Sequence, residues 1–184
     1  AVVVGPNVPG DLRTYEYMSG SNLMNDARRI GGLIQSEINN AVAGDTVLIK
    51  AGSYTEQLTI NKSITVEGAG TATVIKSPAA LAPVSIGGVD RKPVILAQNA
   101  NVTLRNFTVD GLGLGQGSGL PLAPTNYSFM GVAYYNAGGL ISGLTVQNIE
   151  DTPLSGVQHG VGMYLRVGDG SARTIKVLDN VVKD

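Results

Sequence analysis

The sequence predicts an all-β fold, a right-handed parallel β-helix (a solenoid) whose N-terminal end is capped by an α-helix. Three observations lead to this prediction. Apolar residues recur at spacings of three and four only in a short early segment, and after Gly44 they tend to alternate with polar ones. The strands that this alternation implies are short and are separated by Gly or Asn turns. A unit of two such strands returns after 37 residues, at Phe107 and Leu144, and repeats made only of strands and corners are typical of solenoids.

One helix is expected near the N-terminus. Residues 1–24 have no clear period, although the apolar run Val2–Val4 predicts a short strand able to pair with a neighbouring molecule. Apolar residues then recur at spacings of three and four, which predicts a helix with one apolar face. They are Ala27, Ile30, Ile34, Ile38 and Ala41. Asn25 or Asp26 is the expected N-cap, and Gly44 is expected to close the helix. The predicted organisation is an N-terminal extension, 1–24, followed by the capping helix and about five coils over 25–184.

The strands after Gly44 are predicted from short runs rich in β-branched residues. The first runs cover 46–49, 57–60 and 63–66, and the repeating two-strand unit covers 102–111, 140–148 and 175–184. The apolar residue after the corner recurs at intervals of 37 residues, at Phe107, Leu144 and Val181, and a further run precedes each copy, at 94–96, 131–135 and 160–164. Stacked strands lie about 4.8 Å apart, so we expect Phe107 to lie over Leu144 and Tyr135 over Tyr164. The Gly-rich segment 111–124 is expected to project as the longest loop.

Composition excludes several kinds of protein. The 13 Lys and Arg residues nearly balance 14 Asp and Glu, and the net charge of −1 gives no general attraction for nucleic acid or an anionic membrane. The chain has no Cys, which excludes disulfides and Cys-based zinc sites. No apolar run approaches the roughly 20 residues that cross a bilayer. The chain starts without Met and without a signal-peptide pattern, which fits processing after export as well as a segment boundary.

The segment after the predicted helix resembles a known family. The resemblance is carried by Ile34–Gln35, Ala41–Gly44, the run DTVLIKAGSYTE at 45–56 and the run INKSITVEGAG at 60–70. These residues are similar to the N-terminal cap and first coil of the pectin-lyase-like β-helix superfamily, and more closely to bacterial and archaeal surface proteins with β-helix repeats. The resemblance covers about residues 30–184 and implies the fold. It implies no single activity, because the superfamily includes lyases, hydrolases, esterases, epimerases, adhesins and structural proteins.

Three residues are weak candidates for catalysis: Asp151, His159 and Arg173. His159, in the sequence QHG, and Arg173, in RTIK, resemble the Gly-His-Gly and Arg-Ile-Lys motifs of polygalacturonase-like hydrolases of this fold. Both matches are incomplete, and the paired aspartates that would serve as general acid and base are missing, since Asp151 stands alone. A turn histidine that makes a local hydrogen bond is the alternative interpretation of His159.

The sequence also contains candidate residues for a metal site and for a sugar-binding site, and each set has a structural interpretation as well. The resemblance to superfamily lyases implies clustered aspartate ligands for calcium. The available residues, Asp110, Asp151 and Asp169, do not occupy equivalent rungs. We therefore predict no metal site, and a calcium site is the alternative prediction. Tyr134, Tyr135 and Tyr164 are candidates for a carbohydrate-binding surface, or else for stacking contacts between rungs. The N-glycosylation pattern, which an Asn- and Thr-rich chain produces easily, occurs at Asn61, Asn101, Asn106 and Asn126.

Two classes of function follow. The first is a non-enzymatic extracellular or cell-surface solenoid that polymerises head to tail, with Val2–Val4, Val181 and Val182 at the joint and other copies of itself as partners. The incomplete catalytic motifs and the lack of an obvious C-terminal cap favour this class. The alternative is a carbohydrate-active enzyme, or a carbohydrate-binding fragment, that acts on an acidic polysaccharide. Convergence of Asp110, Asp151, His159 and Arg173 in one groove would favour the enzyme.

Overall fold

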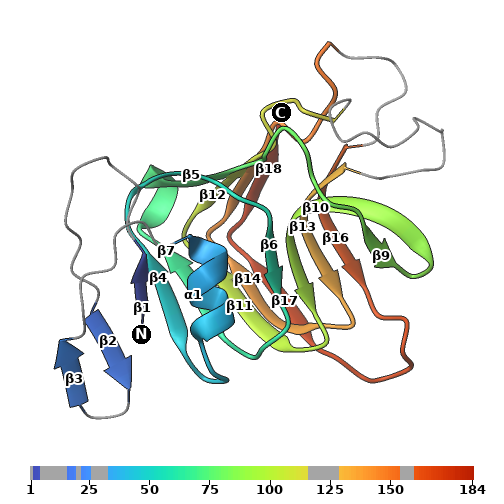
Figure 1. The fold of residues 1–184 in the computed structure, drawn as a ribbon. Coiled ribbons are helices and arrows are strands. Elements are labelled where there is room, and N and C mark those ends of the chain that lie inside the picture. Colours follow the sequence, from blue (N-terminus) through green and yellow to red (C-terminus); the bar gives the residue numbers. More distant parts are fainter. Residues whose placement is uncertain (1, 5–15, 20–21, 26–32, 116–128, 154–159) are drawn as a thin grey trace.

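The computed structural model describes residues 2–4, 16–19, 22–25, 33–115, 129–153 and 160–184, and it is a parallel β-helix (Figure 1). The predicted fold class is confirmed. We name the three main sheets in the order in which each coil visits them. The first sheet contains β1 (Val2–Val4), β4 (Thr46–Ile49), β7 (Thr65–Gly68), β11 (Asn101–Arg105), β14 (Gly138–Ser142) and β17 (Ile175–Leu178). The second contains β5 (Gly52–Thr55), β8 (Thr73–Lys76), β12 (Thr108–Asp110), β15 (Thr145–Gln147) and β18 (Val181–Lys183). The third contains β6 (Leu58–Ile60), β10 (Val89–Gln98), β13 (Phe129–Tyr135) and β16 (Gly160–Arg166).

The remaining elements lie outside this repeating pattern. They are the hairpin of β2 (Glu16–Ser19) and β3 (Asn22–Asn25), the helix α1 (Ile34–Asn40), the 3₁₀ turn η1 (Gly70–Ala72) and β9 (Val84–Ile86). Strands of successive coils pair in parallel, whereas β9 pairs antiparallel with the start of β10. Each coil therefore adds one rung to each sheet, as a solenoid requires.

The core fills the interior of the solenoid. In the first sheet, inward residues of successive coils stack in register as Val47, Val66, Leu104, Ile141 and Val177. The first four are buried, whereas Val177 is 44% exposed because β17 is the outermost strand of its sheet. Full burial of one such aliphatic side chain contributes about 1.5–3 kcal/mol, so the stack is a main source of stability.

The corners between the first and second sheets are short and regular. In the last three coils they turn at one residue in the left-handed region, which is Asn106, Gly143 or Asp179, with φ of 61°, 61° and 55°, whereas the corner between β7 and β8 contains η1. Asn, Asp and Gly tolerate this conformation better than other residues. The connections from the second to the third sheet are longer and differ in length, since β12 and β13 are separated by residues 111–128 and β15 and β16 by 148–159.

Helix α1 caps the N-terminal end, and residues of the first coil satisfy both of its ends. Ile34, Ile38 and Ala41 are buried. The Glu56 carboxylate accepts the backbone N–H groups of Ile34 and Gln35 at 2.9 and 3.0 Å, and Lys62 Nζ donates to the carbonyl of Ala41 at 2.8 Å. A negative group at the N-terminus and a positive group at the C-terminus also match the helix dipole. No helix in the described ranges is long and apolar enough to cross a membrane.

The predicted boundaries of this helix are wrong at both ends. Asn25, an expected N-cap, lies in β3, and the residue before the helix, Leu33, makes no side-chain cap. The helix ends at Asn40, before Gly44, which turns at a φ of 93°. Ala27 and Ile30 lie outside the described residues.

The structure places the predicted N-terminal strand inside the same molecule. Val2–Val4 form β1, which pairs in parallel with β4, so that Val3 lies beside Leu48. One edge of β1 is thus occupied by its own chain. Its predicted pairing with a neighbouring molecule stays a prediction for the other edge.

The predicted stacking is right at one pair of residues and wrong at two. Phe107 and Leu144 precede the paired residues Thr108 and Thr145 and are both buried. Val181 instead pairs with Thr145, one position away from Leu144, because the last coil is one residue shorter. Tyr135 pairs with Arg166, and Tyr164 pairs with Ala133, so Tyr135 does not lie over Tyr164.

A hairpin that the sequence patterns did not predict covers part of the outer face of the third sheet (β9 and β10 in Figure 1). Ile86 of β9 is buried there against a small outer core formed with Leu96, Met130 and Ala133. Tyr135 and Tyr164 pack at the border of this outer core. The hairpin therefore fixes the surroundings of two predicted sugar-binding residues.

Candidate functional site

Asp110, a candidate calcium ligand, is held by hydrogen bonds within the second sheet. Its carboxylate accepts the backbone N–H of Leu112 at 2.9 Å and the side-chain amides of Gln147 and Asn148 at 2.9 and 2.8 Å. Burial alone would raise the pKa of Asp110, but these hydrogen bonds, together with the charge of Lys76, hold its pKa below the usual value. The carboxylate is ionised and already supplied with donors, which favours a structural role.

The other candidate catalytic residues lie on different segments of the chain from Asp110. Asp151 is buried and forms a backbone bridge with Leu114. Arg173 precedes β17 and forms an ion pair with Asp169 on the same loop. His159 lies outside the described residues, so the predicted convergence is untested for it. Within the described ranges, no group of three acidic or histidine side chains gathers to hold a metal ion.

Tyr134 belongs to the interior of the solenoid. Its side chain is fully buried, and its hydroxyl donates to the carbonyl of Val102 at 3.0 Å. Burial raises the pKa of Tyr134. This residue is therefore inaccessible to a sugar, and the predicted carbohydrate-binding surface is left to Tyr135 and Tyr164.

Tyr135 and Tyr164 lie beside two arginines on the outer face of the third sheet. The guanidinium carbon of Arg91 lies 5.5 Å from the centre of the Tyr164 ring, a cation–π contact. Arg166 forms a hydrogen bond with the Tyr164 hydroxyl, which raises the pKa of this arginine. We call these four residues the tyrosine–arginine cluster. Tyr135 and Tyr164 are partly exposed and Arg166 is exposed, whereas Arg91 is buried beneath them.

The fold brings this cluster together from three places in the sequence. Tyr164 and Arg166 lie two residues apart on β16 and therefore point to the same side, and Tyr135 pairs with Arg166 from β13. Arg91 arrives on the β9–β10 hairpin. An added Cβ at Gly87, in the turn of this hairpin, would lie 2.4 Å from the Arg166 guanidinium carbon, so the glycine makes room for the arginine.

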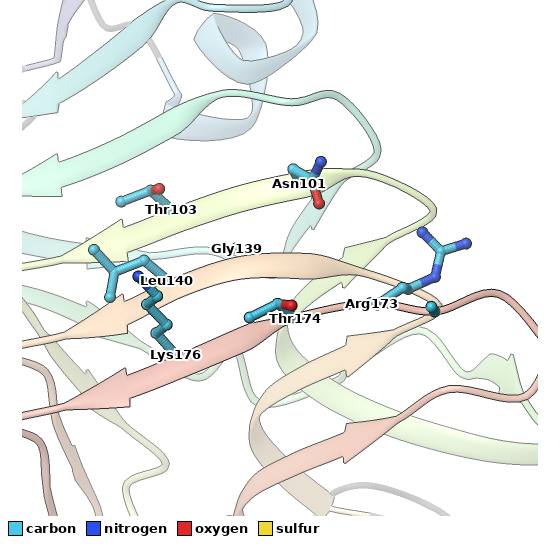
Figure 2. Close-up of a pocket in the computed structure, with 8 residues that line it drawn as sticks. Asn101, Thr103, Gly139, Leu140, Arg173, Thr174 and Lys176 are labelled. Carbon is cyan, nitrogen blue, oxygen red and sulfur yellow. The ribbon is translucent and has the colours of Figure 1, made fainter.

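A polar groove of about 630 Å³ lies on the outer face of the first sheet (Figure 2). We call it the first-sheet groove. Strands β11, β14 and β17 form its floor, and the segment before β17 forms one end. Its lining residues are Asn101, Thr103, Gly139, Leu140, Ala172, Arg173, Thr174 and Lys176. Of the predicted catalytic candidates that the structure describes, Asp151 and Arg173, only Arg173 lines this groove.

Comparison with known proteins identifies a similar fold. No protein-family model and no curated protein matches the chain. Among solved structures, the chain is similar to a mutant of AlyGC, an alginate lyase of the PL6 family, with a TM-score of 0.52 and 17% sequence identity. The similarity covers 99% of this chain and 19% of that chain, so the present chain spans about a fifth of the length of the lyase. This likeness shows the parallel β-helix fold and supports the resemblance to pectin-lyase-like proteins at that level.

Sequence reasoning missed Arg91, Arg166 and Lys176 as members of these two surfaces. Arg91 could be assigned to the cluster only from the β9–β10 hairpin, and no alternation of apolar and polar residues predicted this hairpin. Arg166 had a usable signal, because it lies two residues after Tyr164 and thus on the same face of a strand. Lys176 ends the RTIK run that was compared with a hydrolase motif, but it was not chosen as a candidate itself. The register of the coils was needed to bring them to the other residues.

Proposed function

We propose that this chain binds an acidic polysaccharide on the outer face of the third sheet, through the tyrosine–arginine cluster. The observation that carries the proposal is the contact of Tyr164 with two guanidinium groups, the buried one of Arg91 over its ring and the exposed one of Arg166 at its hydroxyl. A pyranose ring packs on an aromatic face, and a guanidinium group binds a carboxylate through two parallel hydrogen bonds. A uronic acid unit carries both features.

The similar fold gives the proposal a substrate class to test first. The solved structure is that of an alginate lyase, and alginate is a polymer of uronic acids, so alginate oligosaccharides are the natural first ligands. The proposal includes an extracellular or cell-surface location, where such polymers are met. Cleavage is a separate outcome, which the same preparation tests by the absorbance of newly formed unsaturated sugar ends.

Replacing Arg166 with Gln is expected to weaken binding of an alginate tetrasaccharide about tenfold, because hydrogen bonds to charged groups contribute roughly 1.5–3 kcal/mol. Isothermal titration calorimetry measures the affinity. Lys183→Gln is the control, since it also removes one positive charge but lies on β18 of the second sheet, away from the cluster. Wild-type protein that does not bind in the millimolar range, or equal losses in both variants, would contradict the proposal.

Self-association is a second candidate function, favoured by the exposed apolar side chains of the last coil. Val177 and Val182 are 44% and 56% exposed, although the residues beside them in the preceding coil, Ile141 and Val146, are buried. A second copy that stacked its own strands on β17 and β18 would cover these side chains.

Replacing Val182 with Lys is expected to shift the protein from oligomers to the 19.0 kDa monomer, because a charge cannot be buried in an apolar contact without a large cost. Analytical ultracentrifugation over a wide range of protein concentrations measures the change. Ser85→Lys is the control, because Ser85 is exposed on β9, which lies at neither end of the three main sheets. A wild-type chain that remains monomeric at every concentration rules out this function.

A further inference from the structure

We infer that the first-sheet groove is a second and separate binding site for an acidic oligosaccharide, with Lys176 and Arg173 as the carboxylate-binding residues. The inference takes its ligand class from the proposed function but uses a different face of the solenoid. The groove and the tyrosine–arginine cluster share no residue, so each is tested alone.

Glycines in β14 keep the floor of this groove low. Asn101, Gly138 and Thr174 lie in one row across β11, β14 and the start of β17. An added Cβ at Gly138 would lie 2.5 Å from the Asn101 side-chain oxygen and 3.1 Å from the Thr174 carbonyl. In Figure 2 the Asn101 oxygen points towards β14, across the space that a larger residue would fill. The row therefore places the side-chain amide of Asn101 and the hydroxyl of Thr174 on either side of a residue that has no side chain.

The groove carries positive charge that its own walls do not neutralise. Lys176 is exposed, and in the described part of the chain its ammonium has neither an ion pair nor a hydrogen bond. Arg173 pairs with Asp169 through one terminal nitrogen, while its Nε is buried and has no hydrogen-bond partner among the described residues. Among the residues that the structure describes, none that lines the groove is acidic. An anionic ligand would supply a partner for the exposed ammonium of Lys176.

The spacing of the two cations favours a chain of acidic sugars over a single small anion. Arg173 and Lys176 are three residues apart, which corresponds to roughly 10 Å along an extended chain. A single carboxylate or sulfate offers one small charged group, whereas an oligouronate carries a carboxylate on every sugar. Figure 2 places the Lys176 side chain beside Leu140, and these two residues are partners in the pairing of β14 with β17. An apolar surface for a pyranose ring therefore lies next to the cation.

The test is a titration of isotopically labelled full-length chain with an alginate tetrasaccharide, followed by amide NMR signals. We expect two groups of shifting signals, one from β11, β14 and β17 and one from β13 and β16. Lys176→Gln should weaken binding in the first group about tenfold and leave the second unchanged. Lys183→Gln, on β18 of the second sheet, makes the same change of charge on the same coil and should alter neither group.

The variants separate failure of this inference from failure of the proposed function. If Arg166→Gln has no effect while Lys176→Gln weakens the first group, the proposed function fails and the groove stands. The inference is overturned if the tetrasaccharide moves no signal of β11, β14 or β17, or if Lys176→Gln and Lys183→Gln behave alike. It is also overturned if sodium sulfate shifts the same signals with equal affinity, because the site would then recognise any anion.

Discussion

Replacing Gly139 with Ala is expected to lower the free energy of unfolding by at least about 3 kcal/mol. Gly139 lies in β14 at a φ of 122°, which a residue with a side chain rarely adopts. An added Cβ would also lie 2.0 Å from the carbonyl oxygen of Val102 in the neighbouring strand β11. Neither strand can move away without breaking the parallel pairing of β11 and β14. Urea unfolding followed by circular dichroism measures the loss.

Gly170→Ala is the matched control for this substitution. Gly170 also has a positive φ, of 74°, but an added Cβ would meet no atom within 4 Å. Its replacement should cost only the backbone strain of about 1–2 kcal/mol. If both variants lose the same stability, the close approach of β11 to β14 at Gly139 is not a determinant of the fold.

Replacing Tyr134 with Ala is expected to cost about 3–5 kcal/mol of unfolding free energy, as does removal of other large aromatic side chains from protein cores. The ring is among the largest fully buried groups in the described part of the chain, and it is inserted between the first and third sheets. Urea unfolding again measures the change. Because the side chain is inaccessible, sugar binding by any folded fraction should be unaltered.

Tyr134→Phe separates the ring from its hydroxyl. It retains the packing and removes the hydrogen bond to the Val102 carbonyl, so it should cost only about 1 kcal/mol. Loss of sugar affinity in Tyr134→Phe without loss of stability would contradict the interior role and return Tyr134 to the binding surface.

The fold class was predictable because its signal is local. In β4 the residues Val47 and Ile49 are buried and alternate with less buried ones, and the predicted bounds of this strand are the observed ones. The corners were also visible, since Asn106 and Gly143 are residue types that tolerate the left-handed region. These features depend on neighbours in the sequence, which periodicity captures.

The register of the coils was not predictable to the residue. Thr108 pairs with Thr145, 37 residues later, but Thr145 pairs with Val181, 36 residues later. A constant interval therefore fails by one position at the last coil. In the third sheet the connections differ more in length, which explains why Tyr164 was matched with Tyr135 instead of Ala133.

The candidate site was predictable only in part, because its members come from distant segments. Tyr164 was chosen for its ring, but its arginine partners depend on the β9–β10 hairpin and on strand pairing. The ends of the helix show the same limit. Glu56 and Lys62 cap α1 although they lie more than 15 residues after it in the sequence, whereas capping rules consider only residues next to the helix. Long-range partners of this kind require the assembled coils.

The contrast between constant and variable corners has a consequence for engineering. The turn from the first to the second sheet keeps two residues at Asn106–Phe107, at Gly143–Leu144 and at Asp179–Asn180, whereas the passage from the second to the third sheet ranges from two residues to more than ten. In the last three coils, the length of the first connection is thus constant, whereas the length of the second varies. Foreign peptides grafted into the second-to-third passages should therefore leave the pitch of the coils intact.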